Sequence, residues 1–147
     1  VIEAVNEGKS PLILTERTDH LKRIAELLDN KIKNVVILRG GMSKKQRLEV
    51  AQRLDDIDDN EERVIVASGR YIGEGFDDAR LDTLFLALPI SWRGTLQQYA
   101  GRLHRDYDDK KEVTIYDYID SNNPMLMRMY QKRLKGYKAI GYSIQDK

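Results

Sequence analysis

Short, uninterrupted apolar runs alternate with helical patterns along most of this sequence. Five of these runs have the length and composition of strands that are buried on both faces. The predicted strands are 11–15, 34–38, 63–68, 83–88 and 113–118. Because such strands belong to parallel sheets, we expect the helices between them to cover both faces of one sheet.

Apolar residues at helical spacing mark three further segments. After the first predicted strand, the positions at core spacing are Leu21, Ile24, Ala25 and Leu28. After the second, Ser43 and Gln46 have the spacing of a capping box, and the positions predicted to face inward are Val50, Ala51 and Leu54. After residues 122–124, a long basic amphipathic helix is predicted to run to about residue 141. Its side chains available for packing are Leu126, Met129, Tyr130, Leu134 and Tyr137.

These elements predict an α/β fold, with three layers, a mainly parallel central sheet and helices on both faces. In such sheets ligands bind at the carboxyl ends of the strands. The sequence places unusual residues there: Arg17 after the first strand, Arg39-Gly40-Gly41 after the second, and Ser68-Gly69-Arg70 after the third. A binding site is therefore expected at that edge.

The composition limits what the domain can bind. The 147 residues, 41% of them hydrophobic, suffice for one domain with a core. The lack of cysteine and the two isolated histidines predict no metal site. With no apolar run of membrane-spanning length and no leader, we expect an intracellular, cytoplasmic protein with no membrane partner. A net charge of +1 restricts any nucleic-acid contact to a local patch.

Two segments have residue patterns suited to phosphate chemistry. Residues 68–77 hold Gly69, Gly73 and Gly75 after a predicted strand, and their backbone amides could cradle a phosphate. Residues 98–105 place Gln98, Gly101, Arg102 and Arg105 on one helical stripe, opposite an apolar stripe. Two guanidiniums one turn apart suit phosphate oxygens. The structural alternatives are an ordinary glycine-rich turn and a solvated helix face.

Together these segments resemble motifs V and VI of superfamily-two helicases, in the second RecA-like domain. Gln98-x-x-Gly101-Arg102-x-x-Arg105 has the form of motif VI, and Gly75-Phe76-Asp77 has the end of motif V. Residues 13–17 occupy the place of motif IV, and residues 40–47 resemble the following segment, in which a basic residue contacts nucleic acid. The resemblance covers about residues 12–117.

The resemblance implies a role for each matching residue. Arg102 and Arg105 would be arginine fingers on ATP, which can raise turnover about a thousandfold or more. Gln98 would position the nucleotide or the attacking water. The residues expected to contact the cofactor or couple to motif VI are Gly73, Gly75, Asp77 and Gly101. Those expected to hold one nucleic-acid strand by its backbone are Thr15, Arg17, Gly40, Lys44, Arg47, Ser68 and Gly69.

The resemblance also implies partners. ATP and Mg²⁺ would be held mainly by an N-terminal RecA-like domain of the same parent chain, because this sequence has no acidic tetrad and no complete phosphate-binding loop. The fragment alone is predicted to be inactive and monomeric. Gln98 in place of the histidine of DEAD-box proteins, and a motif V one residue longer, favour DNA over RNA. Lys44 stands where DEAD-box proteins favour glutamine, so its contact is not fixed by the resemblance.

The predicted organisation follows from these assignments. Residues 1–10 would end an inter-domain connection, residues 11–120 would form the helicase C-terminal RecA-like domain, and residues 121–147 a helical extension packed on it. The chain begins within a helical pattern, so we expect it to be part of a larger protein. The basic residues of the extension fit either a solvated face or an extended nucleic-acid contact: Arg128, Lys132, Arg133, Lys135 and Lys138.

Two other functions fit the same pattern. One is a non-catalytic nucleic-acid-binding module derived from a helicase domain, and the upstream sequence would distinguish it. The other is a doubly wound enzyme of sugar-nucleotide type. Such an enzyme would bind a mononucleotide tightly as an isolated domain, whereas half of a helicase would bind ATP weakly or undetectably.

Overall fold

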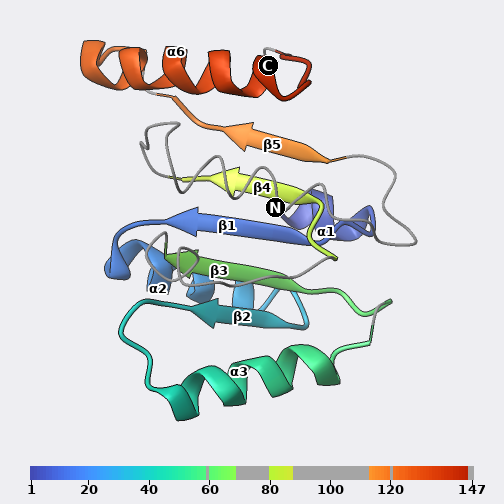
Figure 1. The fold of residues 1–147 in the computed structure, drawn as a ribbon. Helices are drawn as coiled ribbons and strands as arrows, with labels where there is room; N and C mark the ends of the chain where they lie inside the picture. Colours follow the sequence, from blue (N-terminus) through green and yellow to red (C-terminus); the bar gives the residue numbers. More distant parts are fainter. Residues whose placement is uncertain (59, 69–79, 88–112, 120, 146–147) are drawn as a thin grey trace.

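The computed structural model describes residues 1–58, 60–68, 80–87, 113–119 and 121–145 of the chain (Figure 1). Within these ranges the helices are α1 (Ile2–Asn6), α2 (Thr18–Asp29), α3 (Lys44–Asp56) and α6 (Pro124–Ala139). The strands are β1 (Pro11–Thr15), β2 (Val35–Leu38), β3 (Val64–Ser68), β4 (Thr83–Leu86) and β5 (Thr114–Asp117).

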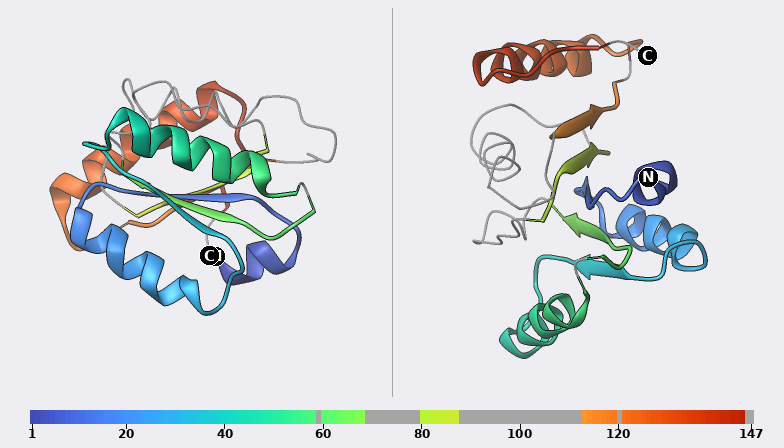
Figure 2. Two further views of the ribbon diagram at one scale, coloured as in Figure 1. Left: turned by 90° about the horizontal axis from the view of Figure 1, so that it is seen from below. Right: turned by 90° about the vertical axis from the view of Figure 1, so that its right-hand side faces the viewer.

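The five strands form one sheet in the order β2-β3-β1-β4-β5, and every neighbouring pair is parallel. β1 is central, with Thr15 in register with Ser68 of β3 and Leu14 in register with Leu86 of β4. Helices α1 and α2 lie on one face of the sheet, and α3 lies on the other (Figure 2). The predicted α/β fold is confirmed.

Successive residues of each strand point to opposite faces of the sheet, so the strands contribute to two cores. The core beside α3 and α6 contains the buried strand residues Leu12, Leu14, Val36, Leu38, Ile65, Ala67, Leu84 and Leu86. The core beside α1 and α2 contains the buried strand residues Ile13, Val35, Val64, Val66 and Phe85. Both faces are therefore apolar, which explains why the strands read as continuous hydrophobic runs.

Helix α2 follows its predicted pattern closely. Leu21, Ala25 and Leu28 are buried, and Ile24 is partly buried against the same core. Leu21 is only 1% exposed, and burial of a leucine side chain stabilises a fold by about 1.5–3 kcal/mol. The spacing of three and four residues thus correctly identified the face that lies on the sheet.

Helix α3 begins as predicted but packs less tightly. Ser43 Oγ accepts a hydrogen bond from the Gln46 N–H, and the Gln46 side chain accepts one from the Ser43 N–H, so the capping box is confirmed. Val50 and Leu54 pack against the core, but Ala51 is exposed, and the prediction that it faces inward is wrong. The helix lies at the β2 end of the sheet, so only a narrow stripe of it meets the core (Figure 2).

Some strands are shorter than predicted. Asn34 was assigned to the second strand, but its backbone oxygen accepts from the Val64 N–H at 2.9 Å and its side chain donates to the Glu62 carbonyl at 2.9 Å. The fourth predicted strand is observed as Thr83–Leu86, and residue 88 lies outside the described residues. The fifth is trimmed by one residue at each end.

A polar cluster fixes the amino-terminal ends of β1 and β4. Asp82 Oδ1 accepts hydrogen bonds from the Ser10 N–H at 2.8 Å and from the Thr83 hydroxyl at 3.0 Å. Arg80 Nε donates to Ser10 Oγ at 2.7 Å, and its other nitrogens bond the carbonyls of Asp58 and Glu61. One guanidinium therefore ties the start of the central strand to the loop that precedes β3.

Helix α6 is joined to the sheet by a buried ion pair. Asn123 caps its first turn, and its Oδ1 accepts from the N–H groups of Met125 and Leu126. Arg133 is 2% exposed and donates to both carboxylate oxygens of Asp117, at 2.8 and 2.9 Å. The prediction that Arg133 belongs to a solvated or nucleic-acid-binding face is wrong. The residue lies on the inner stripe of the helix, opposite the other four basic residues.

Candidate functional site

The carboxyl ends of β1, β2 and β3 bring together residues predicted to hold nucleic acid. We call this region the carboxyl edge and define it as residues 15–17, residues 39–44, Arg47 and Ser68. All five strands point the same way, so the carboxyl ends of these three neighbouring strands lie side by side (Figure 1). Such an edge is where ligands of parallel α/β domains bind.

One hydrogen bond joins two of the predicted contact residues. The Gly40 N–H donates to Ser68 Oγ at 3.0 Å, which ties the turn after β2 to the end of β3. Ser68 is in turn paired in register with Thr15 at the end of β1. Ser68 and Gly40 are half-buried, whereas Thr15 is 1% exposed. The ends of β1 and β3 and the turn after β2 are thus held in fixed relative positions.

The turn after β2 has a geometry that requires glycine. Gly41 has φ +80°, a conformation that side chains with a Cβ rarely adopt. The Arg39 N–H donates to Met42 Sδ at 3.4 Å across this turn. The capping box of Ser43 then starts α3 directly, so Gly40 and the first turn of α3 have a defined relative position.

Two predicted basic contacts lie on the first turn of α3. Lys44 is exposed and Arg47 is half-buried, and they are three residues apart, which places them on neighbouring positions of one helix face. The Arg47 N–H donates to the Ser43 carbonyl at 3.0 Å, so the residue sits in regular helix. Both residues therefore lie in the first turn of the helix that follows the Gly40–Gly41 turn.

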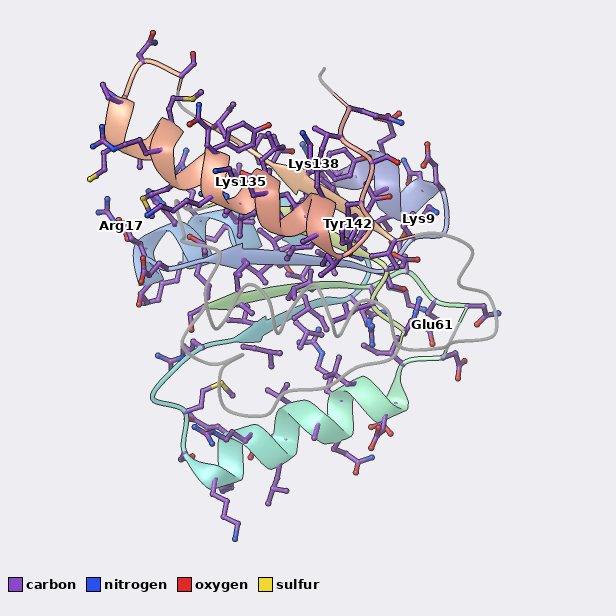
Figure 3. The ribbon with its side chains drawn as sticks, turned by 45° about the horizontal axis from the view of Figure 1, so that its top comes forward. Lys9, Arg17, Glu61, Lys135, Lys138 and Tyr142 are labelled. Carbon is purple, nitrogen blue, oxygen red and sulfur yellow. The ribbon has the colours of Figure 1, made fainter. Side chains whose placement is uncertain are left out.

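The third predicted cation, Arg17, is engaged at the surface. Its guanidinium bonds the Asp19 carboxylate at 3.1 Å, and the two side chains are 68% and 65% exposed (Figure 3). Desolvation alone would raise the pKa of Asp19, but the Arg17 charge and the backbone N–H groups of Asp19 and His20 lower it. Asp19 was not predicted from the sequence. Its position in the first turn of the helix after Arg17 was the available signal.

The remaining site predictions lie outside the described residues. They are Gly69, Gly73, Gly75, Asp77, Gln98, Gly101, Arg102 and Arg105. Their roles stay predictions. In the ranges that the structure covers, no group of three or more His, Asp or Glu side chains could hold a metal ion. No helix in those ranges is both long and apolar enough to cross a bilayer.

The parallel sheet and its helical layers define a RecA-like α/β domain. Residues 1–107 match the family "Helicase conserved C-terminal domain", and the chain belongs to this family. The resemblance inferred from the motifs is therefore confirmed.

Three proteins illustrate what this chain is similar to. Protein 161L of Invertebrate iridescent virus 6, which carries a provisional helicase name, is 37% identical over 84 residues, covering 57% of this chain and 18% of 161L. The structure of T4 UvsW matches with a TM-score of 0.68 at 20% identity, over 94% of this chain and 30% of UvsW. The Sulfolobus solfataricus SWI2/SNF2 ATPase core matches with a TM-score of 0.65 at 18% identity, over 97% of this chain and 28% of that core. The chain therefore spans less than a third of each.

Proposed function

We propose that this chain is the second motor domain of an ATP-dependent nucleic-acid helicase or translocase. The observation that carries the proposal is the carboxyl edge, where the Gly40 N–H bonds Ser68 Oγ at 3.0 Å in a chain of the helicase C-terminal family. This contact joins two segments that motif spacing assigns to strand binding. ATP and Mg²⁺ would be held mainly by an N-terminal RecA-like domain of the parent protein.

In this proposal the carboxyl edge grips one strand by its phosphates. Lys44 and Arg47 on the first turn of α3 would supply positive charge, and Gly40 would let the backbone of the strand approach closely. Such contacts bind with little sequence preference and weaken as salt concentration rises. DNA is the expected substrate, from the glutamine that begins the motif VI pattern.

Arg102 and Arg105 would complete the ATP site when the two motor domains close. Each guanidinium would place charge on the phosphoryl oxygens in the transition state. Gln98 would position the nucleotide or water, and Gly75 and Asp77 would contact ribose or couple this loop to the finger helix. These assignments rest on motif spacing and on family membership.

The direct test replaces each arginine in the intact parent protein. Arg102→Ala or Arg105→Ala should lower nucleic-acid-stimulated ATP hydrolysis by about a thousandfold, because each variant loses a charge that acts in the transition state. ATPase activity that survives within about twofold would exclude the finger assignment. Arg53→Ala is the matched control, because Arg53 is an exposed arginine on α3.

A non-catalytic nucleic-acid-binding module remains the second candidate. The same family membership and the same carboxyl edge support it, without a catalytic partner domain. The sequence encoded upstream of Val1 distinguishes the two, because a motor should have a phosphate-binding loop and an acidic tetrad within about 200 residues, the scale of one domain.

A further inference from the structure

Helix α6 presents a row of cations with no acidic residue in the helix. Arg128, Lys132, Lys135 and Lys138 are all exposed, whereas the fifth basic residue, Arg133, is buried on the opposite side. We call these four residues the α6 row. Figure 3 shows Lys135 and Lys138 along the helix. At 1.5 Å per residue the row is about 15 Å long, close to the axial rise of four phosphates on one strand of DNA.

The other long helices differ from α6 in their charge pattern. On α2 the exposed cations Lys22 and Arg23 lie among the acidic residues Asp19, Glu26 and Asp29. Helix α3 likewise mixes signs, with Arg53 beside Asp55 and Asp56 in its last turns. On both helices the positive charge is therefore offset by acidic residues of the same helix.

The α6 row has no such internal compensation. Its members are spaced by four, three and three residues, so each cation neighbours another cation on the helix surface, and like charges at these spacings destabilise a helix. Within the described ranges none of the four forms an ion pair. The four positive charges are therefore not offset by any acidic residue of the helix.

The packing of α6 fixes the direction in which the row points. Arg133 bonds Asp117 through two nitrogens, and the Tyr137 hydroxyl donates to Asp117 Oδ2 at 2.8 Å. The rings of Tyr137 and Tyr142 meet edge to face, with centroids 6.1 Å apart. The helix cannot roll about its axis without breaking these contacts, so the row is held outward before any partner arrives.

The row also begins at the same end of the sheet as the carboxyl edge. Helix α6 follows β5 and runs back along it, so its first turn lies where the strands end (Figure 1). Tyr118, directly after β5, is 64% exposed, and Met125 in the first turn of α6 is 57% exposed. Proteins bind single-stranded nucleic acids with exposed aromatic rings, on which the bases stack, and with cations, which contact the phosphates.

We infer that the α6 row is a second nucleic-acid contact, which binds the phosphate backbone of the strand held at the carboxyl edge. This inference rests on the proposed function. The row would add affinity without sequence preference, because phosphates are the same along any strand. It would also lengthen the bound segment beyond the carboxyl edge.

The test measures binding of a fluorescent oligothymidylate to the intact protein over a range of salt concentrations. The variant R128Q/K132Q/K135Q removes three cations of the row. The variant K22Q/R23Q/K31Q removes the same residue types from exposed positions on and just after α2, and serves as the matched control. The α6 variant should bind about tenfold more weakly at low salt, with a salt slope smaller by about 2, from three phosphates at about 0.7 each. The control should change affinity by less than about twofold.

A fourth protein, R17Q/K44Q, separates this inference from the proposed function. If it binds weakly while the α6 variant matches the control, strand contact at the carboxyl edge stands and the inference fails. The row would then serve a different partner, such as an acidic protein. If only the α6 variant binds weakly, the row is supported and the carboxyl-edge assignment fails. If the unmodified protein does not bind the oligonucleotide, both fail. Circular dichroism of each variant checks that the fold is retained.

Discussion

Arg133 and Asp117 form a bidentate ion pair in the interior, with Nε–Oδ2 and Nη2–Oδ1 distances of 2.8 and 2.9 Å. The Arg133 side chain is 2% exposed and that of Asp117 is 9% exposed. Arg133 also lies over the Tyr130 ring, 5.7 Å from its centroid. One end of the pair belongs to α6 and the other to the last residue of β5, so the pair joins the C-terminal helix to the sheet.

Removal of one partner should destabilise the domain strongly. Arg133→Met leaves the Asp117 carboxylate buried without its counter-ion, which costs about 3–5 kcal/mol. Urea unfolding monitored by circular dichroism gives the change in free energy of unfolding. The double variant Arg133→Met/Asp117→Leu should lose less than the sum of the two single variants, because neither charge is then left unpaired. Arg53→Met, at an exposed position, should stay within about 0.5 kcal/mol. Additive losses in the double variant would contradict this account.

The tyrosines of the same region should make stability depend on alkaline pH. Burial raises the pKa of Tyr142 to about 12, and burial together with the Asp117 charge raises that of Tyr137 well above its usual range. A folded-state pKa above the unfolded value of about 10 means that the stabilisation is complete below pH 10. It is lost as the pH rises from about 10 to 12, because the unfolded chain releases its protons first.

The measurement is the free energy of unfolding at several pH values between neutral and alkaline. Each tyrosine contributes at most about 1.4 kcal/mol per pH unit to the loss. Tyr142→Phe should make the decline shallower than in the unmodified protein, because it removes one of the two raised groups. An unchanged slope in this variant would show that other groups control the alkaline transition.

Much of the fold could be predicted from local pattern alone. The five strands, the Ser43 capping box and the buried stripe of α2 each follow from residues within one segment. The burial of Arg133 was harder to predict, because a charged side chain is usually exposed. Yet Leu126, Arg133 and Tyr137 share one helix stripe, and that spacing was the signal for its burial. Its partner Asp117 could not be found from sequence, because the contact depends on how α6 packs on β5.

Some features of the candidate site could likewise be predicted from the sequence, and others could not. That Thr15, Gly40 and Ser68 lie at the carboxyl ends of parallel strands could be inferred from the alternation of strands and helices. The hydrogen bond between the Gly40 N–H and Ser68 Oγ could not, because it depends on strand order as well as on the tight turn at Gly41. The ion pair of Arg17 with Asp19 was missed for another reason. Arg17 was predicted to contact phosphate, and its acidic neighbour two residues along the chain was not among the predicted site residues.

Ser68 should be needed to hold the turn after β2. Ser68→Ala removes the acceptor of the Gly40 N–H, and loss of such a bond costs about 1 kcal/mol in free energy of unfolding. Nucleic-acid affinity should fall in parallel, because Gly40 and the first turn of α3 lose a fixed position. Ser68→Thr retains the hydroxyl and should retain both properties. Oligonucleotide binding and urea unfolding of the two variants test this prediction. Equal nucleic-acid affinity in the unmodified protein and both variants would show that Ser68 does not contribute to the binding site.

Tyr118 should contribute to strand binding by stacking rather than by charge. The ring is 64% exposed at the end of β5, and base stacking on such a ring is worth about 1–3 kcal/mol. Tyr118→Ala should therefore weaken oligothymidylate binding about fivefold or more while the salt slope stays constant. Tyr118→Phe keeps the ring and should bind normally. If the salt slope changes in Tyr118→Ala, the loss of affinity would instead come from displacement of nearby cations.

Asp19 should restrain Arg17 as a phosphate contact. The carboxylate lies 3.1 Å from the guanidinium in an exposed pair, so a phosphate must compete with it. Asp19→Asn removes the competing charge and should raise nucleic-acid affinity by about two- to threefold at low salt, with a smaller gain as screening increases. Asp29→Asn changes the same charge at an exposed position at the far end of α2 and serves as the control. If both variants raise affinity equally, the effect is one of net charge and Arg17 has no special position at the strand. If only Asp19→Asn does so, and the added substitution Arg17→Gln abolishes the gain, the guanidinium itself reaches the phosphate.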